Sequence, residues 1–144
     1  MSARSFLDTN IFVYTFDEAA PAKKAKALQL IDAALSEHSA VISTQVIQEF
    51  LNLACRKFKR PLAPRDSRLY LDSVLAPLCS VYPTLSLYAE ALDVFEETRY
   101  SFYDSLIIAA ALKGQCKVLF SEDLQHGQSI RGLRIENPFL TSET

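Results

Sequence analysis

The segment Ser5-Phe6-Leu7-Asp8-Thr9-Asn10 contains a short apolar run that ends in three polar residues. Such a run is typical of a buried strand that stops where a helix begins. Asp8 would then lie at the carboxyl end of the strand. A carboxylate beside apolar sequence is costly to bury unless it is neutralised, paired or bound to a metal. This segment therefore indicates both a fold and a site.

Strand and helix patterns alternate along the rest of the chain. Apolar side chains at helical spacing predict helices over 22–35, from an N-cap at Thr44 to about 58, and around 71–78, 88–95 and 101–114. Short apolar runs predict further strands at 40–43, 80–82, 117–120 and 133–135. This alternation predicts an α/β fold in which helices cover both faces of a central, mostly parallel sheet. We expect one domain over residues 1–144.

The composition excludes several classes of protein. Hydrophobic residues make up 49% and charged residues 22% of the 144 residues, which is typical of a globular protein. The net charge of -2 gives no general attraction to polyanions, so nucleic-acid binding would need a local basic cluster. Three cysteines without C-x-x-C spacing predict neither a disulfide framework nor a zinc site. No signal peptide or membrane-spanning run is evident, and we therefore expect a cytoplasmic protein without membrane contact.

Four acidic residues interrupt or adjoin apolar stretches far apart in the sequence. Asp8 and Asp123 directly follow predicted strands, whereas Glu49 and Asp104 lie near the starts of predicted helices. In parallel sheets, ligands collect outside the carboxyl ends of the strands. We therefore expect the four carboxylates to share one pocket at that rim.

A divalent cation would relieve the repulsion within such a pocket. Two carboxylates about 6 Å apart repel by roughly 3 kcal/mol at an effective dielectric near 20. Mg²⁺ or Mn²⁺ fits an all-oxygen site, and His38 and His126 lie outside the acidic segments. A hard cation with open water positions suits phosphoester hydrolysis.

The acidic segments resemble a known family. The strings D-T-N at 8–10, Q-E-F at 48–50, Y-D-S-L-I at 103–107 and S-E-D-L at 121–124 with Gly127 are similar to the four acidic motifs of the PIN-domain ribonucleases. The resemblance is greatest to the VapC-type toxins of bacterial toxin–antitoxin systems. It covers essentially the whole chain, with the motifs in order, and implies a PIN-like three-layer α/β/α sandwich.

The resemblance also implies roles for individual residues. Asp8, Glu49, Asp104 and Asp123 correspond to the metal-binding carboxylates of an Mg²⁺- or Mn²⁺-dependent endoribonuclease. Thr9 and Asn10 would orient the first acid, and Ser121 would hydrogen-bond beside the ligands. Glu122 adjoins Asp123, and we favour Asp123 because the family places Ser or Thr two residues before its Asp. The resemblance further implies an RNA substrate, a cognate antitoxin and a homodimer.

Other interpretations remain open at this level. Asp8 and Asp104 are also typical of helix caps, Glu49 of a solvated helix face, and Asp123 of a loop. An acidic magnesium pocket is equally a feature of phosphoacceptor signalling domains, and a non-catalytic protein-binding module could retain one. The basic cluster, defined here as Arg56, Lys57, Lys59 and Arg60, would bind RNA phosphates or simply end a helix in solvent, and Phe58 within it could stack a base.

Overall fold

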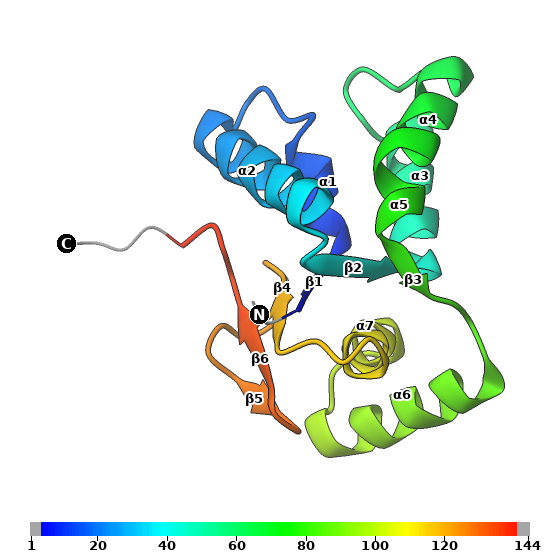
Figure 1. Ribbon diagram of the computed structural model, residues 1–144, viewed down its shortest axis with the longest axis vertical. Coiled ribbons are helices and arrows are strands. Elements are labelled where there is room, and N and C mark those ends of the chain that lie inside the picture. The colour runs from blue at the N-terminus through cyan, green and yellow to red at the C-terminus, as the bar shows by residue number, and fades with distance from the viewer. Residues whose placement is uncertain (1–3, 141–144) are drawn as a thin grey trace.

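A single six-stranded sheet lies at the centre of the molecule (Figure 1). The computed structural model describes residues 4–140, so the outermost residues of the expected domain, 1–3 and 141–144, lie outside it. The strand order is β3-β2-β1-β4-β6-β5, and all neighbours are parallel except β5 and β6. This sheet confirms the expected α/β class. The strands are β1 (Ser5–Leu7), β2 (Ala40–Ser43), β3 (Cys79–Val81), β4 (Val118–Phe120), β5 (Ser129–Ile130) and β6 (Leu133–Glu136).

Helices pack on both sides of the sheet. Figure 1 shows α6 and α7 on one side and the remaining helices on the other, which gives the expected three layers. The helices are α1 (Thr9–Tyr14), α2 (Pro21–Glu37), α3 (Thr44–Arg56), α4 (Pro64–Tyr70), α5 (Ala76–Leu78), α6 (Leu85–Thr98) and α7 (Phe102–Lys113).

The longest apolar run of the chain forms the buried helix α7. Every residue of 105–111 is buried, because α6 covers one side of the helix while β2 and β4 contact another. Gly114 ends α7, and a Cβ there would lie 3.2 Å from Cγ2 of Val41, so close packing selects glycine at this position. Within residues 4–140, no helix combines the length and the apolar character needed to cross a membrane.

A widened helical turn joins α4 to α5. Residues Leu71–Leu75 form a π-helical turn, which continues the axis from Pro64 to Leu78. Pro77 has no N–H, and its ring would clash with the carbonyl of Ser73 in a regular α-helix. The wider turn accommodates this proline. The apolar spacing around 71–78 indicated a helix but not the change in its register.

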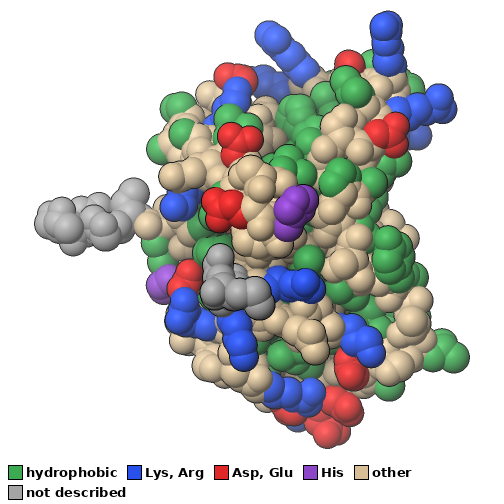
Figure 2. Space-filling view, in the orientation of Figure 1, with side chains coloured by type: hydrophobic (Ala, Val, Ile, Leu, Met, Phe, Trp, Pro, Cys, Tyr) green, Lys and Arg blue, Asp and Glu red, His purple; other side chains and the backbone are tan. Residues whose placement is uncertain are grey.

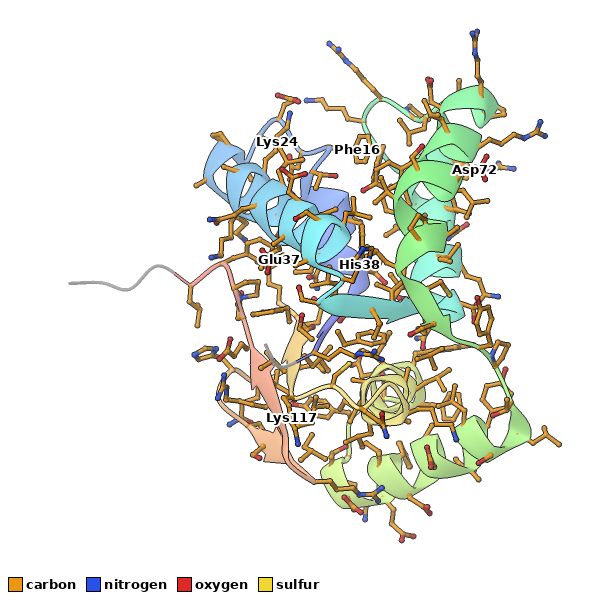
Figure 3. The ribbon with its side chains drawn as sticks, viewed as in Figure 1. Phe16, Lys24, Glu37, His38, Asp72 and Lys117 are labelled. Atoms are coloured by element: carbon orange, nitrogen blue, oxygen red, sulfur yellow. The ribbon has the colours of Figure 1, made fainter. Side chains whose placement is uncertain are left out.

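An aromatic cluster connects α1, α3 and α4. The Phe50 ring stacks on Tyr70 with centroids 4.9 Å apart, and Phe16, which is labelled in Figure 3, contacts both rings. Phe58 packs on Phe16 and Phe50 at centroid distances of 5.5 and 5.9 Å. Phe58 is only partly buried in this cluster, so base stacking by its ring stays a prediction. Packing of Phe50 also fixes the part of α3 that carries Glu49.

Two local predictions are wrong in detail, and one short strand was not predicted. The N-cap of α3 is Ser43, and Thr44 is the first helical residue. The third strand begins and ends one residue earlier than the expected 80–82. The two-residue strand β5 was not anticipated, since its pairing with β6 depends on a turn at 131–132 rather than on a periodic pattern.

The side on which the chain adds strands to the sheet changes between β1 and β4, although these two strands are parallel. Successive strands continue from β1 to β2 and β3 on one side, while β4 lies on the other side of β1. Ligands in open α/β sheets bind at such a switch point, outside the carboxyl ends of the strands. The Asp8 N–H donates to the Phe120 carbonyl at 3.0 Å, so the residues after β1 and β4 lie side by side.

Candidate active site

Asp8 is a buried carboxylate at the junction of β1 and α1. Its side chain is 5% exposed and acts as the N-cap of α1. Oδ1 accepts the Thr9 N–H at 2.7 Å, and Oδ2 accepts the Ser121 hydroxyl at 2.7 Å. Burial, and to a lesser extent the charges of Asp123 and Glu49, raise the Asp8 pKa from 3.8 to about 7 against the effect of these hydrogen bonds. Capping and participation in an acidic pocket therefore coincide at this residue.

Glu49 lies on the second turn of α3 and faces Asp8. The Thr9 hydroxyl donates to Oε1 of Glu49 at 2.6 Å. Thr9 thus contacts two acids, Asp8 through its backbone N–H and Glu49 through its side chain. Thr9 was expected to orient Asp8, and its hydroxyl contacts Glu49 in addition.

The segment after β4 presents two acids in different directions. Asp123 accepts the Asn10 side-chain amide at 3.1 Å, and its N–H donates to Ser121 Oγ at 3.2 Å. Asn10 therefore holds Asp123 rather than the expected Asp8. Glu122 instead accepts the Tyr14 hydroxyl at 2.5 Å and pairs with Lys23 at 2.5 Å.

The contacts of Glu122 separate its role from that of Asp123. Although burial opposes the effect, hydrogen bonds from Lys23 and Tyr14 lower the Glu122 pKa. Lys23 also lies over the Tyr14 ring, 4.8 Å from its centroid. Glu122 thus joins the loop after β4 to α1 and α2, while Asp123 faces Asn10.

Asp104 lies in the first turn of α7. Its N–H donates to the Ser101 hydroxyl at 3.1 Å, the cap of this helix. Burial raises the Asp104 pKa, and the charges of Asp123 and Glu49 raise it further while the Ser101 contact lowers it. Both Asp8 and Asp104 are thus within electrostatic reach of Asp123 and Glu49. The fold brings all four predicted acids to one region.

Neutral donors contact three of the four acids. In the described part of the chain, no three Asp, Glu, His or Cys side chains are already grouped as a metal site. The side chains of Thr9, Asn10 and Ser121 each donate to one carboxylate, namely Glu49, Asp123 and Asp8, and these hydrogen bonds favour the ionised acids.

The donor atoms suit a hard divalent cation. All the acids offer oxygen, as Mg²⁺ and Mn²⁺ prefer. Asn10 Oδ1 is buried and has no hydrogen-bond partner among residues 4–140, which leaves a further neutral oxygen beside Asp123. A carboxyl such as Asp8, whose pKa is raised by burial and to a lesser extent by neighbouring acids, also gains from a nearby cation.

An open groove runs from Glu49 and Asp123 along α1 and α3, and Asp8 and Asp104 are not among the residues that line it. We call it the acidic groove; its volume is about 510 Å³. The basic cluster follows at the end of α3, where all four of its side chains are exposed. Figure 2 shows Lys and Arg side chains projecting from that end of the molecule. The lining residues of the groove are Thr9, Asn10, Val13, Tyr14, Asp17, Glu49, Asn52, Leu53 and Asp123.

Gln45 is a site residue that the sequence did not reveal. Its side chain is 8% exposed, and Nε2 donates to Glu49 Oε2 at 3.1 Å and to the Tyr103 carbonyl at 3.1 Å. Gln45 thus joins the helix of Glu49 to the helix of Asp104. The spacing of Gln45 and Glu49, four residues apart on one helix, was the only signal available for it.

The chain belongs to the PIN domain family, because the family model described as PIN domain matches residues 5–128. This match confirms the resemblance inferred from the acidic motifs. No sequence among the curated proteins matches the chain.

Solved toxin–antitoxin structures share the fold. A DNA-bound VapBC structure from Salmonella typhimurium is 20% identical, with a TM-score of 0.66. The match covers 94% of this chain and 98% of that chain. A toxin–antitoxin complex from Klebsiella pneumoniae is 17% identical, with a TM-score of 0.64 and coverages of 90% and 94%. Mycobacterium tuberculosis VapC20, described as a sarcin-ricin loop cleaving toxin, is 21% identical, with a TM-score of 0.57 and coverages of 83% and 89%.

Proposed function

We propose that this protein is an Mg²⁺- or Mn²⁺-dependent endoribonuclease that acts as the toxin of a toxin–antitoxin pair. The observation that carries the proposal is the buried Asp8 at the switch point of the sheet, electrostatically coupled to Glu49 and Asp123. Membership of the PIN domain family supports it, as does the fold shared with the VapC20 toxin.

In this proposal Asp8, Glu49, Asp104 and Asp123 hold the metal. When bound, the ion supplies an acidified water and a positive charge beside the scissile phosphate. Ser121 orients Asp8, Thr9 orients Glu49 and Asn10 orients Asp123 through the hydrogen bonds described above. Each hydroxyl or amide thereby fixes the orientation of its acid, which the reaction requires.

The RNA strand would follow the acidic groove toward the basic cluster. Arg56 lies seven residues after Glu49 on α3, about 10 Å further along the helix axis. Arg56, Lys57, Lys59 and Arg60 would contact phosphates outside the reacting centre. None of these four forms an ion pair within the described residues, so their charges are available.

Two protein partners complete the proposal. A cognate antitoxin is suggested by the toxin–antitoxin complexes that share the fold. A homodimer is the second partner, as the resemblance of the sequence to VapC-type toxins implies. Antitoxin binding at the acidic groove would silence cleavage.

Cleavage of RNA with Mg²⁺ or Mn²⁺, compared with chelator, tests the enzymatic part. We expect cleavage by the wild type and by Asp72→Asn, which is a matched control on an exposed face. Asp8→Asn should cleave at least about a hundredfold more slowly. Full activity of Asp8→Asn, or cleavage unaffected by chelator, would refute the assignment. Growth arrest on expression of the wild type but not of Asp8→Asn tests the toxin role.

A further inference from the structure

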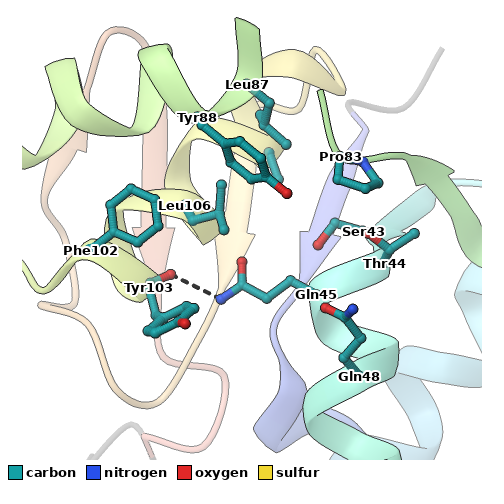
Figure 4. Close-up of a pocket in the computed structure, with 11 residues that line it drawn as sticks. Ser43, Thr44, Gln45, Gln48, Pro83, Leu87, Tyr88, Phe102, Tyr103 and Leu106 are labelled. Carbon is teal, nitrogen blue, oxygen red and sulfur yellow. Dashed lines mark hydrogen bonds between the residues drawn. The ribbon is translucent and has the colours of Figure 1, made fainter. Parts of the chain in front are cut away.

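A second pocket lies beside the acids on the far side of Gln45. It has a volume of about 360 Å³, within the range of pockets that bind small ligands. The start of α3, the residues before α6, and the facing sides of α6 and α7 form its walls (Figure 4). Among the described residues, those that line it are all uncharged. We call it the Gln45 pocket, with Ser43, Gln45, Tyr88, Phe102, Tyr103 and Leu106 as its main lining residues.

The orientation of the Gln45 amide is fixed by its neighbours. Both hydrogens of Nε2 are used, one by Glu49 Oε2 and one by the Tyr103 carbonyl. Neither acceptor could be served by the amide oxygen, so Oε1 must face the opposite way. Oε1 is buried and has no hydrogen-bond partner within residues 4–140. Figure 4 shows this oxygen directed into the pocket, toward Tyr88.

A second unpaired group points into the same space. Ser43 is 3% exposed, and its hydroxyl is also buried without a partner in the described structure. Ser43 is the N-cap of α3 yet makes no side-chain capping bond, so the N–H groups of the first turn keep a partial positive charge. The pocket thus offers one fixed acceptor, one hydroxyl and a helix N-terminus. Leaving such buried groups unpaired is costly.

These groups and walls select a neutral, planar ligand that donates a hydrogen bond. A cationic side chain would find no charged partner among the lining residues. An aliphatic side chain would leave Gln45 Oε1 unpaired. A nucleobase carries N–H donors and acceptors at its edge, and its faces stack on aromatic rings. Tyr88 and Tyr103, which are 38% and 66% exposed, provide such rings.

We propose that the Gln45 pocket binds one base of the RNA substrate, next to the scissile phosphate. This inference rests on the proposed function, and it adds that the enzyme reads a nucleotide rather than phosphates alone. Gln45 connects the two sites directly, because one amide touches both Glu49 and the pocket. Base recognition and positioning of a metal-binding acid would thus depend on the same side chain.

Binding of mononucleotides in chelator tests the proposal without cleavage. The probes are AMP, CMP, GMP and UMP, with purine riboside monophosphate, which lacks the amino group, and ribose 5-phosphate, which lacks the base. The readouts are the Kd and the NMR shifts of the Gln45 side-chain amide and the Tyr88 ring. Variants Tyr88→Ala and Ser43→Ala are compared with Tyr88→Phe, which keeps the stacking ring.

We expect at least one nucleotide to shift both resonances, with ribose 5-phosphate having no effect there. Tyr88→Ala should weaken binding roughly tenfold through loss of stacking, and Tyr88→Phe should weaken it by less than about threefold. Absence of these shifts, equal binding of ribose 5-phosphate, or unchanged affinity in Tyr88→Ala would overturn the proposal. The proposal would also be overturned if Tyr88→Ala changed the oligomeric mass but left nucleotide binding unaffected, because the pocket would then be covered by a second copy of the chain.

Two further outcomes separate this proposal from the proposed function. If nucleotides bind in the Gln45 pocket but RNA is never cleaved with metal, the pocket stands and the nuclease assignment fails. If RNA is cleaved with metal but no nucleotide perturbs the pocket, the nuclease assignment stands and base recognition by Gln45 fails.

Discussion

Replacing Asp8 with Asn should stabilise the metal-free protein in alkaline solution. Burial is the main cause that raises the Asp8 pKa to about 7. The folded state therefore binds this proton more tightly than the unfolded state does. Between pH 3.8 and about 7 the stability of the wild type falls as the pH rises, since the buried carboxyl must ionise.

The size of the effect follows from the pKa change. Raising the pKa from 3.8 to about 7 corresponds to about 4 kcal/mol, at about 1.4 kcal/mol for each tenfold change in proton affinity. Asn keeps an oxygen for the Thr9 N–H but loses the Ser121 hydroxyl bond, which costs about 1 to 2 kcal/mol. A net gain of about 2 kcal/mol remains at pH 8, or roughly 4 to 8 °C in Tm.

Thermal unfolding in chelator, followed by circular dichroism from pH 5 to pH 8, measures this difference. The Tm advantage of Asp8→Asn should be largest at pH 8 and close to zero at pH 5. Asp72→Asn, which makes the same charge change at an exposed residue labelled in Figure 3, should show neither gain nor trend. A lower Tm for Asp8→Asn at pH 8, or an advantage that persists at pH 5, would contradict the reasoning.

Three further predictions concern other parts of the molecule. Because Glu122 pairs with Lys23, Glu122→Gln should lower the free energy of unfolding by at most about 1 kcal/mol and leave metal uptake, measured by calorimetry, unchanged. Asp123→Asn should weaken that uptake. The triple change of Lys57, Lys59 and Arg60 to Ala should reduce the dependence of log Kd for RNA on log salt by about 2, unlike Lys117→Ala. Phe50→Ala should cost about 3 to 5 kcal/mol in denaturant unfolding, because the fully buried ring centres the aromatic cluster.

The sequence alone determined the class of fold and predicted the set of acids. Helical and strand periodicities appear within windows of a few residues. The alternation of strands and helices, and the positions of Asp8 and Asp123 after strands, could therefore be predicted directly. The buried helix 102–113 was visible for the same reason. The apolar spacing around 71–78 indicated a helix, but not that the chain would widen a turn over Leu71–Leu75.

Only the tertiary structure decided which partner each acid takes. Ser121 reaches Asp8 across 113 positions, Asn10 reaches Asp123 across the same interval, and Glu122 turns to Lys23 across 99. Such contacts depend on strand order and helix packing, which no local pattern encodes. In the sequence Gln45 does not differ from other polar helical residues. Only the structure shows that α7 places the Tyr103 carbonyl beside its amide. Its free oxygen, and the pocket it faces, exist because distant elements meet there.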